Sequence, residues 1–211
     1  MIMMLQPLTS IDAINDYLFI SGYAPVNLVN LKKYSIKLVV DATNLPARNF
    51  LPSAEVSSSN GGEKDQEERE RIELIKVNVD DSESSLLKPF FDCVCDKIKM
   101  IKESGGKILV HCAAGISRSA TLCIVYLMKH EDMSLREAYA TVYSKRSIIS
   151  PNNGFWRQMI EYETELKGST TVTMIKTKFR EIPDVYLAKN PPSIMSSCQN
   201  VDDQRKSEKV Q

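Results

Sequence analysis

The chain has 211 residues, of which 43% are hydrophobic and 26% charged, as in an ordinary globular domain with tails. Lys plus Arg and Asp plus Glu number 27 each, so the balanced charge gives no electrostatic reason to expect nucleic acid as a partner. No basic residue precedes Lys32, and no apolar run approaches the roughly 20 residues that span a bilayer. We therefore expect no integral membrane segment. We expect an intracellular protein, cytoplasmic or nuclear, or mitochondrial without a visible transit peptide.

Strand and helix patterns alternate along most of the chain. Strands are predicted at short apolar or alternating runs, at residues 17–20, 37–40, 74–79 and 107–110. Helices are predicted where apolar residues recur every three or four positions, at residues 27–34, 85–103, 119–130, 134–146 and 153–167. A β-branched stretch at residues 170–175 favours an extra C-terminal edge strand. This order predicts an α/β fold with a central, mainly parallel twisted sheet flanked by helices.

The same patterns divide the chain into three parts. A short N-terminal lead covers residues 1–14, a single domain covers residues 15–187, and a tail rich in Pro, Ser and mixed charge covers residues 188–211. That composition predicts a flexible tail. Within the domain, residues 52–73 are polar and carry a run of charges, which predicts a solvated surface insertion. A docking loop is the alternative interpretation of this insertion.

The five cysteines are odd in number and have no disulfide-framework spacing, which indicates reduced thiols. Cys93 and Cys95 are two positions apart in a helical pattern and point to different faces, so they are poor joint metal ligands. Neither histidine has a second ligand at metal spacing, and no metal site is predicted. Cys93, Cys95 and Cys123 are interpreted as structural residues of helices. Cys112 is the reactive candidate.

Cys112 lies in the segment His-Cys-Ala-Ala-Gly-Ile-Ser-Arg-Ser, residues 111–119, between a buried strand and a buried helix. Backbone N–H groups of such a loop can converge on an anion, and the helix N-terminus adds partial positive charge. That field favours a thiolate. The guanidinium of Arg118 can bind two phosphoryl oxygens at once, and Ser119 can donate its hydroxyl to the sulfur. A thiolate facing a phosphoryl group can perform covalent phosphoryl transfer without a metal or another cofactor.

This segment resembles the H-C-x5-R-[S/T] signature of cysteine-dependent phosphatases, in the A-G-x-S-R-S form usual for dual specificity protein phosphatases. Residues 134–139, S-L-R-E-A-Y, resemble the next helix of that family, and residues 149–156, I-S-P-N-N-G-F-W, resemble its P-N-x-G-F segment. The resemblance covers roughly residues 15–187 and includes a stretch at 171–186 like that of a few small atypical members. It implies the cysteine-phosphatase fold and hydrolysis of phosphorylated protein substrates.

The resemblance also implies a role for each matching position. Cys112 would be the nucleophile that forms a phosphocysteine, and Ser119 would assist release of the thiolate. His111 and Asn152 would orient the loops. The phosphoryl oxygens would be bound by Arg118 and by the loop residues Ala113, Ala114, Gly115, Ile116 and Ser117.

A general acid is needed on a separate loop to protonate the leaving oxygen. Asp80 and Asp81 follow the predicted strand that ends at Val79, and Asp81 is 31 residues (112 − 81) before Cys112. Both the context and the separation resemble the general-acid position of the family, best aligned with Asp81. Asp80 remains the alternative, because one of the two aspartates could instead cap the next helix.

The variable positions of the loop are uncharged, which argues against a polyphosphorylated lipid and favours phosphoprotein substrates. The resemblance implies a shallow pocket open to phosphotyrosine, phosphoserine and phosphothreonine. One rival function is a catalytically weak, phosphatase-like protein that binds phosphopeptides. Another is a redox or arsenate-reducing enzyme, which needs a resolving cysteine near Cys112. Cys93 or Cys123 could also form a protective disulfide with Cys112 under oxidation.

Overall fold

The computed structural model of the chain describes residues 8–46 and 72–187. The predicted tail 188–211, residues 1–7 of the predicted lead, and residues 52–71 of the predicted insertion lie outside the described residues. The last two residues assigned to the insertion belong to the folded body instead. Ile72 is buried in the core, and Glu73 begins a strand of the sheet. Ile72 is apolar and directly precedes a paired strand, so its side chain packs into the core. The prediction placed it in the insertion because the residues before it are polar.

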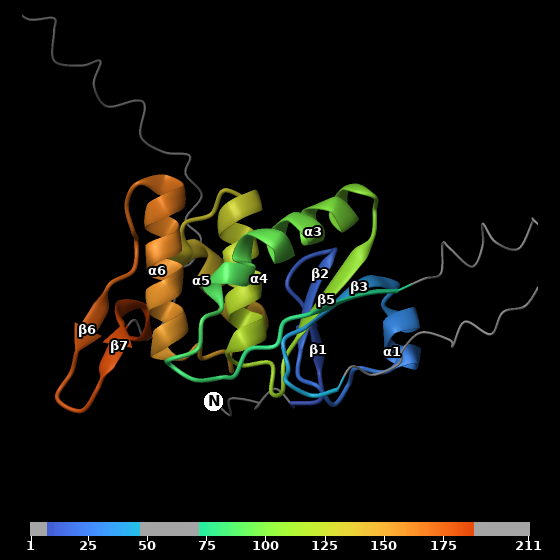
Figure 1. Cartoon of the computed structure of the whole chain (residues 1–211), viewed down its shortest axis with the longest axis horizontal. Coiled ribbons are helices and arrows are strands. Elements are labelled where there is room, and N and C mark those ends of the chain that lie inside the picture. The colour runs from blue at the N-terminus through green and yellow to red at the C-terminus, as the bar shows by residue number, and fades with distance from the viewer. Residues whose placement is uncertain (1–7, 47–71, 188–211) are drawn as a thin grey trace, which may run out of the picture.

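A five-stranded sheet forms the middle of the molecule (Figure 1). Its strands lie in the order β1 (Ile11–Ala13), β2 (Leu18–Ser21), β5 (Lys107–His111), β3 (Ile36–Asp41) and β4 (Glu73–Lys76). β1 is antiparallel to β2, whereas the other three neighbouring pairs are parallel. The predicted mainly parallel sheet is therefore confirmed, and β1 is an additional strand within the predicted lead.

The two faces of the sheet pack against unequal layers of helices. Alternating side chains of a strand point to opposite faces, so Ile108 and Val110 enter the larger core while Leu109 enters the smaller one. The larger core is covered by four helices, α3 (Phe91–Glu103), α4 (Arg118–His130), α5 (Leu135–Lys145) and α6 (Asn153–Lys167). The short helix α1 (Leu28–Lys33) covers the smaller core (Figure 1). None of the helices in the described ranges has the length and apolar character to cross a membrane.

Helix α3 begins at Phe91, later than the start predicted at residue 85. A short 3-10 turn, η1 (Lys88–Phe90), precedes it and contains Pro89. The residue before a proline is disfavoured in helical conformation. The amides of Leu87 and Lys88 donate instead to the side-chain oxygen of Gln158 on α6, each at 2.8 Å. The side chain of Gln158, distant in sequence, thus accepts from two backbone donors that lie just before α3.

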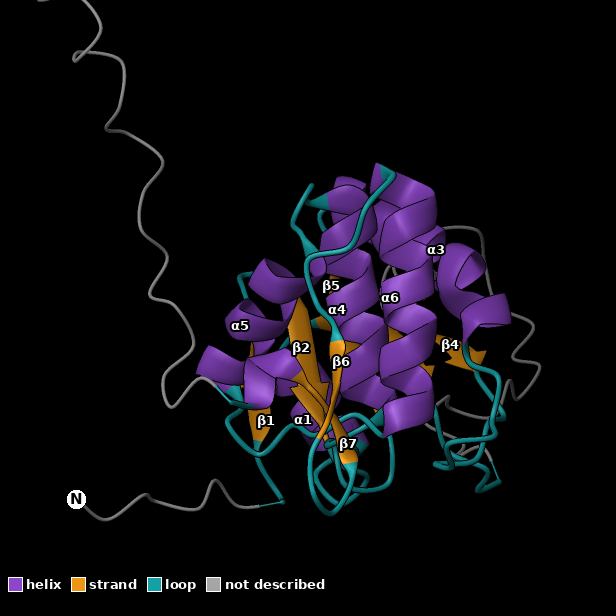
Figure 2. Cartoon of the chain, turned by 90° about the vertical axis from the view of Figure 1, so that its left-hand side faces the viewer, coloured by secondary structure: helices purple, strands orange, loops and turns teal. Residues whose placement is uncertain are grey.

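The C-terminal strand pattern forms a separate hairpin of β6 (Met174–Lys176) and β7 (Glu181–Pro183), followed by the 3-10 turn η2 (Asp184–Tyr186). The hairpin lies beside α6, on the side away from the main sheet (Figure 1 and Figure 2). Of the strand predicted at residues 170–175, only Met174 and Ile175 lie in a strand, β6, and its partner is β7, not an edge of the five-stranded sheet. Its connection to α6 depends on Glu163, a fully buried carboxylate that accepts hydrogen bonds from Thr170 and Thr171.

Candidate active site

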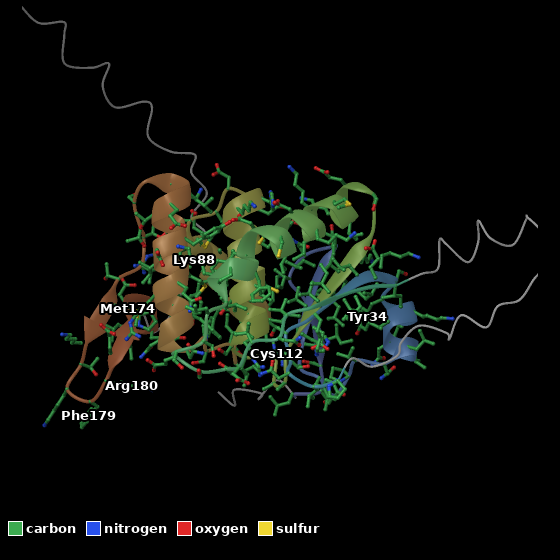
Figure 3. The ribbon with its side chains drawn as sticks, in the orientation of Figure 1. Tyr34, Lys88, Cys112, Met174, Phe179 and Arg180 are labelled. Atoms are coloured by element: carbon green, nitrogen blue, oxygen red, sulfur yellow. The ribbon has the colours of Figure 1, made fainter. Side chains whose placement is uncertain are left out.

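The segment between β5 and α4 lies at the carboxyl ends of the parallel strands (Figure 3). Cys112 directly follows β5, and Arg118 is the first residue of α4. Ligands of open α/β sheets bind at the carboxyl ends of the strands, and anions bind at helix N-termini. We call residues 112–118 the catalytic loop below.

The sulfur of Cys112 is buried and faces polar hydrogens. The residue is 1% exposed, and its Sγ lies 3.2 Å from the hydroxyl oxygen of Ser119. The backbone N–H of Gly115 donates to the same sulfur at 3.3 Å. The structure therefore brings together Cys112 and Ser119 as the sequence predicted.

The guanidinium of Arg118 has one hydrogen-bonded nitrogen and one buried nitrogen without a hydrogen-bond partner among the described residues. Its Nη1 donates to the carbonyl oxygen of Val79 at 3.1 Å. Its Nε is buried, has no hydrogen-bond partner within the described residues, and lies 3.8 Å from a carboxylate oxygen of Asp81. A buried donor without an acceptor is costly. A bound oxyanion would supply that acceptor.

The backbone of the catalytic loop leaves amides for a ligand. The carbonyl oxygens of Ala113 and Ile116 accept hydrogen bonds from neighbouring segments. Within residues 8–46 and 72–187, no acceptor bonds the amides of Ala113, Ala114, Ile116 and Ser117. Gly115 makes the sharp bend possible, because its φ is +71° and a Cβ atom there would lie 2.5 Å from the backbone of Ser21.

The two consecutive aspartates have different partners. One oxygen of Asp81 accepts hydrogen bonds from the hydroxyl of Ser117 at 2.7 Å and from the side-chain amide of Asn152 at 2.9 Å. Asp80 instead accepts a hydrogen bond from the side chain of Asn44. Asp81 is therefore the aspartate that contacts the catalytic loop. Asn152 also caps the N-terminus of α6, which fixes its position.

His111 is the last residue of β5, directly before the catalytic loop, and a buried aspartate lies near its side chain. His111 is 1% exposed, and its Nε2 is 3.7 Å from a carboxylate oxygen of Asp41. Asp41 in turn accepts hydrogen bonds from Thr43 and from the ammonium of Lys76. Sequence reasoning missed Asp41. The available signal was a charged residue at the end of the apolar strand predicted at residues 37–40.

The other cysteines of the described chain are unlike Cys112. All four described cysteines, Cys93, Cys95, Cys112 and Cys123, are free thiols. Burial raises the pKa of the Cys95 and Cys123 thiols far above the ordinary value, so both stay protonated and unreactive at neutral pH. Cys93 is exposed on α3. Within the described ranges, His, Cys, Asp and Glu form no group of three or more that could hold a metal ion.

Comparison with known proteins assigns the family. The family model of the dual specificity phosphatase catalytic domain matches residues 18–165. The chain belongs to the dual specificity phosphatase family. The chain is 49% identical over 116 residues to dual specificity protein phosphatase 14 of Mus musculus, a match that covers 55% of the chain and 59% of that relative. Dual specificity protein phosphatase 18 of Mus musculus is 38% identical over 183 residues, which cover 86% of the chain and 88% of that protein.

Solved structures confirm the fold of this dual specificity phosphatase family member. A mouse putative dual specificity phosphatase complexed with zinc tungstate superposes with a TM-score of 0.63 at 28% identity, covering 77% of the chain and 91% of the neighbour. The human tyrosine phosphatase-like serine/threonine/tyrosine-interacting protein gives a TM-score of 0.61 at 30% identity, with coverage of 74% and 97%. The fold expected from the signature segment is therefore confirmed.

Proposed function

We propose that this chain is a protein phosphatase that hydrolyses phosphotyrosine and phosphoserine or phosphothreonine through a phosphocysteine intermediate. The observation that carries the proposal is the convergence of Cys112, Arg118 and Asp81 on one loop. The buried sulfur of Cys112 accepts a hydrogen bond from the N–H of Gly115. The buried Nε of Arg118 has no hydrogen-bond partner among the described residues and lies 3.8 Å from the carboxylate of Asp81. Membership of the dual specificity phosphatase family supports it.

In the first step, the Cys112 thiolate attacks the phosphorus of the bound phosphomonoester. Arg118 and the free loop amides bind the nonbridging oxygens and offset the negative charge. The bond between phosphorus and the substrate oxygen breaks, and the protonated carboxyl of Asp81 gives its proton to that oxygen. The products are a dephosphorylated side chain and phosphocysteine.

In the second step, a water molecule attacks the phosphorus and transfers a proton to the Asp81 carboxylate. The phosphorus–sulfur bond breaks and releases inorganic phosphate. The hydroxyl of Ser119, 3.2 Å from the sulfur, donates a hydrogen bond to the departing thiolate. Ser117 and Asn152 hold Asp81 at the loop in both steps, and His111 supports the backbone beside Cys112.

The substrate class follows from the chemistry of the catalytic loop. Its variable side chains, Ala113, Ala114, Ile116 and Ser117, carry no charge that would bind additional phosphates, which favours phosphoproteins over polyphosphorylated lipids. The mouse neighbour is complexed with zinc tungstate, and tungstate is a tetrahedral oxyanion like phosphate.

We assign the phosphatase domain to residues 15–187. The free thiols of the described cysteines are in keeping with a reducing, intracellular compartment.

Hydrolysis of p-nitrophenyl phosphate in the presence of EDTA tests the proposal. We expect turnover by the wild type and none by Cys112→Ser, since a serine hydroxyl is a much poorer nucleophile than a thiolate. Wild-type protein that is folded and reduced but inactive would refute the hydrolase. Phosphopeptide pull-down by that inactive protein would then support the second candidate, a phosphatase-like binding protein, which the human interacting-protein neighbour brings into consideration.

The paired variants Asp81→Asn and Asp80→Asn test the general acid. With a phosphotyrosine peptide, we expect Asp81→Asn to lower kcat by about 10²–10⁴-fold and Asp80→Asn to leave it near wild type. The loss should be smaller with p-nitrophenyl phosphate, because nitrophenolate departs with less need of a proton. Equal effects of the two variants, or the reverse order, would remove Asp81 from this role.

A further inference from the structure

A second arginine contacts the catalytic loop through its carbonyl oxygens. Arg146, the C-cap residue that follows α5, is fully buried at 0% exposure. Its Nε donates to the carbonyl of Gly115 at 2.8 Å, and its Nη2 donates to the carbonyl of Ala114 at 3.1 Å. Its Nη1 binds the carboxylate of Asp12 on β1 and, at 3.1 Å, the hydroxyl of Ser10. All three nitrogens of this guanidinium are therefore bonded inside the protein.

These contacts complete the hydrogen bonding of the loop carbonyls. The carbonyl of Ala113 accepts from the amide of Tyr23, and that of Ile116 accepts from the amide of Ser150. Arg146 takes the two carbonyls between them, those of Ala114 and Gly115. Four consecutive carbonyl oxygens are thus each held by a group from outside the loop.

A held carbonyl fixes the amide of the next residue. In a trans peptide the C=O and the following N–H point in opposite directions within one plane. The peptide whose carbonyl belongs to Ala114 has the N–H of Gly115, and this N–H donates to the sulfur of Cys112. The peptide whose carbonyl belongs to Gly115 has the N–H of Ile116, which has no acceptor in the described chain. Arg146 therefore fixes the orientation of two peptide groups. The N–H of one, from Gly115, donates to the sulfur, and the N–H of the other, from Ile116, is available to an oxyanion.

We propose that Arg146, fixed by Asp12, is a positioning residue that presets the catalytic loop for the thiolate and the phosphoryl oxygens. The inference rests on the proposed phosphatase function. Donors that already face the position of developing charge need no rearrangement during the reaction, which is a large source of catalysis. Arg146 supplies this order without touching substrate, because every one of its nitrogens is occupied.

The chemistry requires an arginine at this position. A planar guanidinium can place two N–H groups on two neighbouring carbonyls and keep a third nitrogen for a carboxylate, whereas a lysine ammonium is a compact point charge on a flexible stem. Asp12 compensates the buried charge. Its removal would leave a cation uncompensated in the interior, which is strongly unfavourable.

Another arginine of α5 gives a matched control. Arg136 also donates to a backbone carbonyl, that of Thr171 through Nε at 3.0 Å and Nη2 at 2.8 Å, and also pairs with a carboxylate, that of Asp184 at 2.6 Å. It joins α5 to the C-terminal segment, and within the described residues its hydrogen bonds go to Thr171 and Asp184, not to the catalytic loop. Arg136→Lys therefore reproduces the chemical change of Arg146→Lys away from the site.

The experiment compares Arg146→Lys, Asp12→Asn and Arg136→Lys in the full chain. Three quantities are measured: kcat/KM for p-nitrophenyl phosphate, the inhibition constant of vanadate, and the rate of Cys112 alkylation by iodoacetamide at mildly acidic pH. We expect Arg146→Lys to lower kcat/KM by about 10²-fold, to weaken vanadate and to slow alkylation. Asp12→Asn should shift all three in the same direction by less, and Arg136→Lys should leave them unchanged while it lowers Tm.

The outcomes separate positioning from stability. If Arg146→Lys lowers Tm but vanadate inhibition and alkylation stay at wild-type values, the residue is only structural and the inference is wrong. If Arg146→Lys does not fold, Asp12→Asn decides by the same two measurements. If the wild type itself hydrolyses nothing, the proposed function fails, yet slower alkylation of Cys112 in Arg146→Lys would still support loop positioning and an unchanged rate would overturn it.

Discussion

Glu163 offers a quantitative test of how the C-terminal hairpin is attached to the domain. Its carboxylate is fully buried and accepts four hydrogen bonds. One oxygen accepts from the amide of Leu135 at 2.6 Å and the hydroxyl of Thr171 at 2.8 Å. The other accepts from the hydroxyl of Thr170 at 2.8 Å and the amide of Thr171 at 2.7 Å. One side chain of α6 thus binds the start of α5 and the segment that leads to β6.

Glu163→Gln keeps the shape and replaces one oxygen by an NH₂ group, which cannot accept from the backbone N–H that it faces and can bond the neighbouring threonine hydroxyl only if that hydroxyl turns to accept. Hydrogen bonds to a charged group contribute about 1.5–3 kcal/mol each, so the loss of both amounts to about 3–6 kcal/mol. The neutral amide avoids the cost of burying a charge, which offsets part of this loss. We expect a net destabilisation of about 3 kcal/mol, and for a chain of this size roughly 2–4 °C in Tm per kcal/mol.

Thermal unfolding with a matched surface variant provides the assay. Glu161→Gln breaks the pair of an exposed carboxylate with Lys88, and such pairs contribute less than about 1 kcal/mol. We expect Glu163→Gln to lower Tm by roughly 6–12 °C, to accelerate amide exchange in residues 171–186, and to leave hydrolysis at low temperature unchanged. A Tm change no larger than that of Glu161→Gln would refute the reasoning.

Three further predictions concern the loop, pH and the thiols. Gly115→Ala should cost about 1–3 kcal/mol of stability for its strained backbone and should weaken vanadate inhibition; normal inhibition would contradict the loop geometry. Burial opposes ionisation of Glu131, but the hydrogen bond from Lys102 and those from two tyrosines outweigh it and hold its pKa below the ordinary value. This carboxylate therefore stabilises the fold at neutral pH, and the contribution is lost as pH falls below 4.5, the ordinary value, and through the lowered pKa. The acid-side decline in Tm should be shallower in Glu131→Gln. Iodoacetamide should leave Cys95 and Cys123 unmodified in the folded protein, which peptide mapping by mass spectrometry checks.

The parallel core of the fold was predictable because its signals are local. The strands around 37–40 and 107–110 are apolar on both faces, which is typical of a sheet covered on both sides. β1 was missed because three residues of mixed character, Ile11–Ala13, carry no periodic signal, and their strand conformation depends on pairing with β2. The late start of α3 depends on Gln158, a residue 71 positions from the amide of Leu87.

In the candidate site, too, the residues with a local sequence signal were predicted and those that depend on the tertiary fold were not. Cys112, Arg118 and Ser119 belong to one nine-residue segment, so the sequence alone brought them together. Asp81 was preferred over Asp80 by its resemblance to the general-acid position of the family, because the sequence pattern alone does not separate the two aspartates. Arg146 gave no such signal. A basic residue at the end of a helix is favourable to the helix dipole on an exposed surface, and only the tertiary fold shows that this one is buried beside two carbonyls.

Arg118 in the catalytic loop and Arg146 beside it are both buried arginines, but they differ in their hydrogen bonding. Arg146 has a hydrogen-bond acceptor for each nitrogen, and all of these acceptors belong to the protein. Its guanidinium therefore stabilises one conformation of the loop backbone. Arg118 has a carbonyl for Nη1 and a carboxylate beyond hydrogen-bond distance for Nε, so its positive charge is only partly satisfied. Both residues are buried, and both approach an aspartate. The difference in hydrogen bonding, not in burial or charge, is why we assign the phosphoryl group of the proposed reaction to Arg118 and a positioning role to Arg146.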